Sequence, residues 1–298
     1  MRQRTVAVAL ALFAAAFATS AAAEPYRLAP YKDDLFKYPV ILSSEDNGDF
    51  LVVGYDKQRD LYGRDQVPER KVWSEYVSSV ARASGSYQSP SGTLQYFGAG
   101  KIDGGAKAVV IYIHGQGGNR FQGVDDGMFG GNFNRIMNLM AANDGAYLSP
   151  DFTDIGAAGA ADIKALVLDQ ARRSPEAAIF VACGSQGGAI CWDLAEDKDV
   201  VPHLAGLLLL GSGHDDAFLK SPTVKDRKAR RFPIFLGHGT LDPIFPWQDE
   251  AAFYKSLRKA APGYPVRFVA FDTGVHGTPI RMVDWRLVLN WMLEADGR

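Results

Sequence analysis

One short segment, residues 183–188 (CGSQGG), has the residue types and spacing that could do chemistry. The apolar run 177–182 precedes it, and a helical pattern follows at once. This order predicts a strand, a sharp turn with Ser185 at its tip and then a helix, which is the geometry of a nucleophile elbow. A serine hydroxyl is a poor nucleophile unless a base and N–H donors for the oxyanion lie beside it. The segment predicts nucleophilic catalysis by Ser185, although a Gly-Ser turn without chemistry has the same local pattern.

The two cysteines of the chain lie in and just after this segment. The usual elbow motif is Gly-x-Ser-x-Gly. Gly187 fits it, whereas Cys183 stands where the first glycine is usual. Cys191 would lie about two turns into the following helix, and a disulfide needs Cα atoms within about 7 Å. We therefore expect two buried free thiols, and the spacing offers no zinc-type cluster.

The base for Ser185 should be one of the five histidines. His276 lies after the last predicted strand, 266–271, in a loop that overhangs the same end of the sheet as Ser185. It is the predicted base. His114 and His238 each end a strand beside a glycine, which indicates structural roles.

The acid that orients the base should lie between the serine and the histidine in chain order. Asp242 sits on a tight turn past the predicted strand 232–236, where it could accept the Nδ1 proton of His276 and fix the tautomer of the ring. Asp215 and Asp216 follow the preceding strand and remain open as alternatives. Asp242 is the predicted acid.

A glycine-rich loop, residues 114–119 (HGQGGN), follows the apolar strand 108–113. Such a loop lets the backbone approach a bound carbonyl. The N–H groups of Gln116 and Gln186 are the predicted oxyanion hole. A phosphate loop is the alternative, but no Gly-Lys-Ser/Thr follows and the Gly-x-Gly-x-x-Gly pattern is absent, so nucleotide binding is disfavoured.

Strand and helix patterns alternate from residue 94 onward, which indicates a mostly parallel central sheet with helices on both faces. This α/β architecture would bring the ends of several strands to one edge. Residues 24–93 are predicted to be an N-terminal extension with edge strands and a helix packed on the same domain, and a separate small domain is the alternative. The expected strands are 94–97, 108–113, 146–148, 177–182, 206–210, 232–236 and 266–271, and the expected helices are 133–142, 161–173, 249–260 and 283–294.

Four motifs of this chain together resemble the α/β-hydrolase superfamily, especially its single-domain serine esterases. The motifs are HGQGG at 114–118, Ser185 on its elbow, HGTLD at 238–242 and His276 followed by glycine. The resemblance covers residues 94–298 and implies a catalytic domain of that fold there. It implies an oxyanion segment, a nucleophile, an acid loop and a histidine loop in that order. Residues 24–93 gain nothing from it.

The first 23 residues have the pattern of a secretory signal peptide. A short basic start precedes an alanine-rich apolar stretch, and Ala21-Ala22-Ala23 before Glu24 fits a cleavage site. A membrane anchor is the alternative, but the stretch is short for a span of about 20 residues. The expected location is periplasmic or secreted, with no stable membrane insertion after cleavage. No basic block suggests a nucleic-acid partner.

The sequence thus predicts an exported serine hydrolase that cleaves carboxylic esters of short acyl groups through an acyl-enzyme, without metal or cofactor. The polar segment 212–231 argues against a lipase for long-chain fats. A small-molecule or saccharide ester is the expected substrate. A peptidase of the same fold stays open, and so does a catalytically silent binding protein. The side chains expected to line the pocket mix aromatic and polar groups: Asp125, Asp126, Phe129, Asn132, Phe245 and Trp247.

Overall fold

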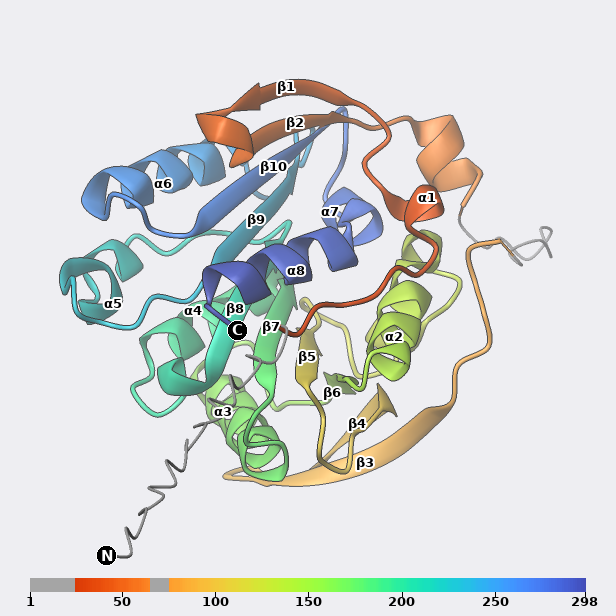
Figure 1. The fold of residues 1–298 in the computed structure, drawn as a ribbon, viewed down its shortest axis with the longest axis vertical. Helices are drawn as coiled ribbons and strands as arrows, with labels where there is room; N and C mark the ends of the chain where they lie inside the picture. Colours follow the sequence, from red (N-terminus) through yellow and green to blue (C-terminus); the bar gives the residue numbers. More distant parts are fainter. Residues whose placement is uncertain (1–24, 65–74) are drawn as a thin grey trace, which may run out of the picture.

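The computed structural model describes residues 25–64 and 75–298. The predicted signal peptide, residues 1–23, lies outside the described residues. The described chain forms a ten-stranded sheet with helices packed on both faces (Figure 1).

The strand order across the sheet is β1-β2-β10-β9-β8-β7-β5-β6-β4-β3. Neighbouring strands from β2 to β6 run parallel, whereas antiparallel pairs are confined to the two edges. The predicted fold class, an open and mostly parallel sheet, is confirmed. The strands are β1 Ile41–Glu45, β2 Phe50–Gly54, β3 Arg82–Ser89, β4 Gly92–Gly100, β5 Ala108–Ile113, β6 Ala146–Pro150, β7 Ala178–Gly184, β8 Leu204–Leu210, β9 Ile234–Gly239 and β10 Val266–Asp272.

The central strands are apolar along their whole length because helices cover both faces of the sheet. Strand β8, for example, reads LAGLLLL and is buried throughout. One core lies between the sheet and helices α2, α7 and α8, and the other between the sheet and helices α3, α4 and α6 (Figure 1). The helices are α1 Asp33–Phe36, α2 Asn132–Ala142, α3 Ala157–Arg173, α4 Gly188–Glu196, α5 Pro222–Lys225, α6 Trp247–Ala260, α7 Thr278–Met282 and α8 Trp285–Ala295.

Element boundaries differ from the sequence expectation by a few residues. Strand β8 begins at Leu204 instead of 206 because Leu204 pairs with Ile179 of β7. Helix α8 begins at Trp285 instead of 283 because the Asp284 side chain accepts the N–H of Leu287 and caps the helix there. Caps and cross-strand pairs set these limits, and the hydrophobic pattern alone does not show them.

The described part of residues 24–93 contributes strands to both edges of the sheet. Strands β1 and β2 extend the sheet beside β10, and β3 pairs with β4 at the opposite edge. The domain boundary expected between residues 93 and 94 falls inside β4, so it would divide the hairpin of β3 and β4. In this architecture the N-terminal segment is integrated with the main sheet.

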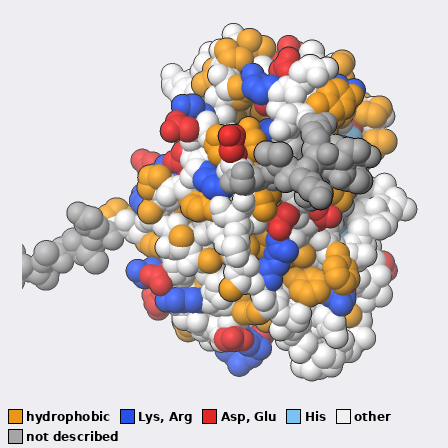
Figure 2. Space-filling model, turned by 90° about the vertical axis from the view of Figure 1, so that its right-hand side faces the viewer, with side chains coloured by type: hydrophobic (Ala, Val, Ile, Leu, Met, Phe, Trp, Pro, Cys, Tyr) orange, Lys and Arg blue, Asp and Glu red, His pale blue; other side chains and the backbone are white. Residues whose placement is uncertain are grey.

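The surface carries charges of both signs. On the face in Figure 2, Lys and Arg side chains are interspersed with Asp and Glu side chains. Within residues 25–64 and 75–298, no helix combines the length and the apolar character needed to cross a membrane.

Candidate active site

Ser185 lies on a strained turn at the end of β7. The turn continues as a 3-10 segment, Ser185–Gly187, directly into α4. Ser185 has φ of 52°, in the left-handed region that few non-glycine residues occupy. A Cβ on Gly115 would come within 2.8 Å of the Ser185 Cβ, and a Cβ on Gly187 within 2.6 Å of the His114 carbonyl oxygen. The close approach of these segments explains why small residues surround the predicted nucleophile.

The structure brings the three predicted catalytic side chains into one hydrogen-bonded chain. The Nε2 atom of His276 lies 2.8 Å from the Ser185 Oγ, and its Nδ1 atom lies 2.8 Å from the Asp242 Oδ2. The three residues follow β7, β9 and β10, which are parallel, so their carboxyl ends meet at one edge of the sheet. This arrangement can pass a proton from a serine hydroxyl to an imidazole.

The hydrogen bonds of Asp242 fix the orientation of its carboxylate. Its side chain is fully buried. Its Oδ1 accepts the backbone N–H groups of Ile244 and Phe245, so Oδ2 faces His276. A carboxylate can only accept, and the shared proton therefore sits on Nδ1 of the imidazole. The lone pair of Nε2 then points at Ser185, which is the tautomer that a general base needs.

The rival acids lie elsewhere. The Asp215 carboxylate accepts the N–H of Ala217 in its own turn. The Asp216 carboxylate lies 3.8 Å from the Nε2 atom of His214. Within the described chain, Asp242 alone among these three carboxylates bonds His276.

The histidines at the ends of β5 and β9 are buried and have local partners. His114 stacks on Phe152, with 4.2 Å between the ring centroids. His238 donates from Nε2 to the Phe245 carbonyl oxygen at 2.8 Å. Burial lowers the pKa of both rings, which favours their neutral forms. These contacts support the loops that surround the site.

The two predicted oxyanion donors lie beside Ser185. Gln186 is in the first turn that leads into α4, where backbone N–H groups have no intrahelical acceptor and the helix dipole favours negative charge. Gln116 follows β5 and lines a cavity together with Ser185. Its N–H donates to no other described residue. Both groups are therefore free to bind an oxyanion.

The fold of this chain is similar to that of several solved structures. No family model matches the chain, and no curated protein matches it. An esterase from Pyrococcus furiosus matches with 15% identity and a TM-score of 0.51, over 73% of this chain and 96% of that chain. An α/β serine hydrolase homologue from Coxiella burnetii matches with 18% identity and a TM-score of 0.50, over 71% and 98%. An esterase domain from Rhodothermus marinus matches with 16% identity and a TM-score of 0.50, over 72% and 98%.

The chain has the α/β-hydrolase fold. The predicted resemblance is confirmed at the level of fold.

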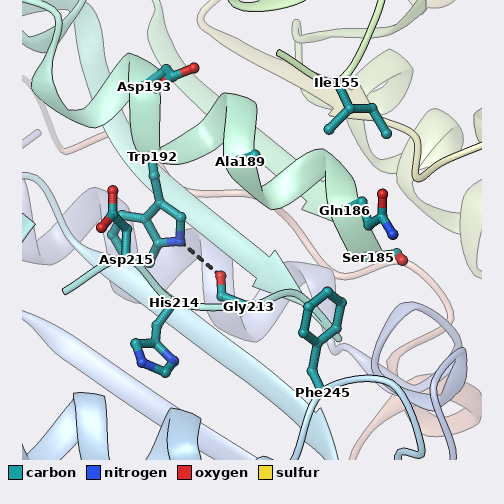
Figure 3. A pocket seen from close by; sticks show the side chains of 10 residues that line it. All are labelled: Ile155, Ser185, Gln186, Ala189, Trp192, Asp193, Gly213, His214, Asp215 and Phe245. Carbon is teal, nitrogen blue, oxygen red and sulfur yellow. Dashed lines mark hydrogen bonds between the residues drawn. The ribbon is translucent and has the colours of Figure 1, made fainter. Parts of the chain in front are cut away.

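In this α/β-hydrolase fold, Ser185 lies between two cavities of different size. The larger, of about 480 Å³, runs along α4 past Trp192 and Phe245 (Figure 3). The smaller, of about 190 Å³, lies against Phe129 and Ile280 and contains His276.

Some residues expected in the pocket lie outside both cavities. Phe245 lines the larger cavity, as predicted. Trp247 instead packs against Phe268 in the core, because α6 begins at Trp247 and turns that side chain inward. Asp125 accepts backbone N–H groups in its own turn. Asp126 pairs with Arg82. None of these three side chains lines either cavity.

The two remaining pocket expectations have different outcomes. Phe129 lines the smaller cavity. Asn132 is buried and lines neither cavity, and its amide donates to the carbonyl oxygens of Ile280 and Val283. The sequence analysis missed Trp192 and His214, which line the larger cavity. Helical spacing from the elbow would have placed position 192 about two turns along α4 from the serine.

Cys183 and Cys191 form a disulfide, so the prediction of two free thiols is wrong. Helix α4 begins at Gly188, which places Cys191 in its first turn and not two turns along. The two Cα atoms are 6.3 Å apart, within the range that a disulfide spans. The bridge closes a short loop around Ser185 and ties the end of β7 to α4. It also accounts for a cysteine where the motif usually has glycine.

We expect this bridge to stabilise the α/β-hydrolase domain. Replacing both cysteines by alanine should lower the free energy of unfolding by about 2–3 kcal/mol, because the unfolded chain regains the entropy that the closed loop removes. Urea denaturation of the wild type and the double variant measures this difference. Reductant should destabilise the wild type and leave the double variant unchanged. Equal midpoints for both proteins in the absence of reductant would contradict the prediction.

Proposed function

We propose that this protein is an exported serine hydrolase that cleaves carboxylic esters through an acyl-enzyme. The observation that carries the proposal is the hydrogen-bonded chain Ser185–His276–Asp242 beside two free backbone donors. Solved structures of the same fold that are named esterases add support at the level of fold.

The proposed reaction has two halves. The Ser185 Oγ attacks the acyl carbon while Nε2 of His276 takes its proton, and the N–H groups of Gln116 and Gln186 bind the oxyanion. His276 then gives the proton to the leaving alcohol, and the C–O bond breaks. Water next attacks the acyl-enzyme, losing a proton to His276, and the acid leaves as Ser185 regains that proton. Asp242 keeps the imidazole oriented in both halves. These steps use protein groups alone.

The sizes of the two cavities suggest which one binds the acyl group of the ester and which one binds its alcohol. The smaller one, about 190 Å³, is below the usual size of a ligand pocket and is lined by Phe129 and Ile280 among others. A short acyl group fits this space. The larger cavity, about 480 Å³, has room for the alcohol. Ser185 lies between the two, where the scissile bond must be.

A panel of p-nitrophenyl esters run beside peptide anilides tests this proposal. The wild type should hydrolyse acetate and butyrate best, cleave the anilides far more slowly and keep its activity in EDTA. Phe129→Ala should raise the relative kcat/KM for hexanoate about tenfold, since room for two more methylenes is worth about 1.6 kcal/mol. Phe121→Ala is the matched control, because its exposed ring lines neither cavity.

Three results of the panel would count against the proposal. Faster cleavage of peptides than of esters would favour a peptidase, and turnover of neither would favour a binding protein. Loss of activity in EDTA with recovery on added zinc would move the chemistry to a metal-bound water. If Phe129→Ala has the same preference for acyl length as the wild type, the smaller cavity does not bind the acyl group.

The proposal of export rests on residues 1–23 and on the buried disulfide. Disulfides persist in oxidising compartments such as the periplasm or the extracellular space. The pattern of the first 23 residues supports the same location. N-terminal sequencing of the exported protein should begin at Glu24. Retention of Met1 on the exported protein would contradict the proposal.

A further inference from the structure

The larger cavity contains a second histidine–carboxylate pair. His214 lines the cavity, and its Nδ1 atom lies 2.9 Å from the Oε1 of Glu250 in α6. The Glu250 side chain is only 3% exposed, and its Oε2 has no hydrogen-bond partner among the described residues. The His214 ring also stacks on Phe253, with 5.3 Å between the centroids. The ring is therefore held from two sides.

A buried carboxylate is costly unless a charged or hydrogen-bonded partner compensates it. The partner of Glu250 is the His214 ring, and their hydrogen bond raises the pKa of His214, with a smaller opposing effect of burial. Because a carboxylate only accepts, the Nδ1–H of His214 is directed to Glu250, and Nε2 is the ring atom left for another partner. The nearest acidic oxygen to Nε2 belongs to Asp216, at 3.8 Å, which is beyond hydrogen-bond distance. The Nε2 atom on the wall of the cavity is thus left without a hydrogen-bond partner in the described chain.

The neighbouring residue supplies an acceptor on the same wall. Asp215 lines the cavity, accepts one backbone N–H from Ala217 and forms no ion pair with any described residue. In Figure 3, Asp215 and Trp192 lie at the end of the cavity away from Ser185. Trp192 is fixed there because its Nε1–H donates to the Gly213 carbonyl oxygen at 2.9 Å. Along α4 this end is roughly 10 Å from the nucleophile, at 1.5 Å per residue.

We propose that His214 and Asp215 bind the hydroxyl groups of the leaving alcohol, so that the preferred substrates are short-chain esters of a sugar or another polyol. A hydroxyl group both donates and accepts, so two neighbouring hydroxyls can bond Nε2 of His214, in either protonation state, and the Asp215 carboxylate together. The apolar face of the alcohol then packs on Phe245. This inference rests on the proposed ester hydrolysis and names its substrate class.

The other alcohol classes fit this wall less well. An alcohol with a carboxylate would meet Asp215 and Asp193. A plain alkyl or aryl alcohol would cover the Nε2 atom of His214 and leave it without a hydrogen-bond partner, which costs free energy. A neutral polyhydroxylated group avoids each of these penalties. In this scheme Glu250 is a positioning residue, which acts through His214.

Two acetate esters with different alcohols test the proposal: p-nitrophenyl acetate and a monoacetylated methyl glucoside. In His214→Phe the ring still stacks on Phe253 but has no donor. Its kcat/KM for the glucoside ester should fall about tenfold, mainly through KM, because the hydrogen bond to Nε2 of His214 is lost. The ratio of its kcat/KM values, glucoside ester over p-nitrophenyl acetate, should fall by about tenfold, because the nitrophenyl group offers no hydroxyl to His214. His214→Gln, which keeps a donor, should recover part of the loss.

Asp215→Asn is a second variant. It leaves the buried pair of His214 and Glu250 intact, so it should fold even if His214→Phe does not. It should also lose activity selectively on the glucoside ester. Equal losses on both esters in His214→Phe and in Asp215→Asn would show a structural role and overturn the proposal. A wild type that prefers hexyl acetate to the glucoside ester would overturn it as well. Failure of the wild type to hydrolyse p-nitrophenyl acetate would instead be a failure of the proposed function.

Discussion

Ser185→Ala should lower kcat/KM on p-nitrophenyl acetate by about 10⁴-fold or more. The hydroxyl that lies 2.8 Å from His276 is removed, and only the oxyanion donors and the binding cavities remain to accelerate the reaction. The fold should be retained, since the side chain lies at the tip of a turn and alanine meets the same backbone conformation there. The melting temperature should therefore change by no more than a few degrees.

Steady-state kinetics and thermal melting of the purified variant measure both quantities. Ser84→Ala is a suitable control, because Ser84 is exposed on β3, far from the site in the strand order. It should match the wild type in both measurements. Near-wild-type hydrolysis by Ser185→Ala would show that Ser185 is not the nucleophile and would contradict the proposed mechanism.

Asp242→Asn should lower kcat by about 10⁴-fold, although the two side chains have nearly the same shape. The N–H groups of Ile244 and Phe245 donate to Oδ1, so the oxygen of an asparagine must stay at that position. Its amide nitrogen then faces His276 and donates to Nδ1. The imidazole proton moves to Nε2, and the ring can no longer accept the proton of the serine.

The pH-independent kcat of Asp242→Asn on p-nitrophenyl acetate is the measurement. Asp216→Asn is the matched control at one of the rival acids, and it should stay within about twofold of the wild type. If Asp216→Asn loses activity while Asp242→Asn keeps it, the acid has been assigned to the wrong loop, although a serine hydrolase mechanism could still hold.

Much of the fold was determined by local sequence patterns. The apolar runs of β5, β7 and β8 and the glycines around Ser185 predict a parallel sheet and a turn with serine at its tip, because burial on both faces and close backbone approach leave few other residue types possible. The order of Ser185, Asp242 and His276 after three separate strands also follows from the chain. Parallel strands bring such positions to one edge of a sheet.

Only the tertiary structure decided between residues that share the same local pattern. Asp242 and Asp215 both follow a strand, and the backbone N–H groups that orient Asp242 toward His276 appear only when the loops are packed together. The disulfide of Cys183 depended on how far Cys191 lies along α4, where it is in the first turn and not about two turns along as expected.

The walls of the cavities were also decided by tertiary packing. Trp247 is an aromatic residue that was expected in the pocket, but it packs against Phe268 in the structure. His214 is oriented by its hydrogen bond to Glu250, which lies 36 residues away in sequence. A hydrophobic pattern specifies whether a side chain is buried, but not which distant side chain it meets. Because the helices and loops that line a cavity come from separate parts of the chain, their contacts are set by how those parts pack and not by any one segment.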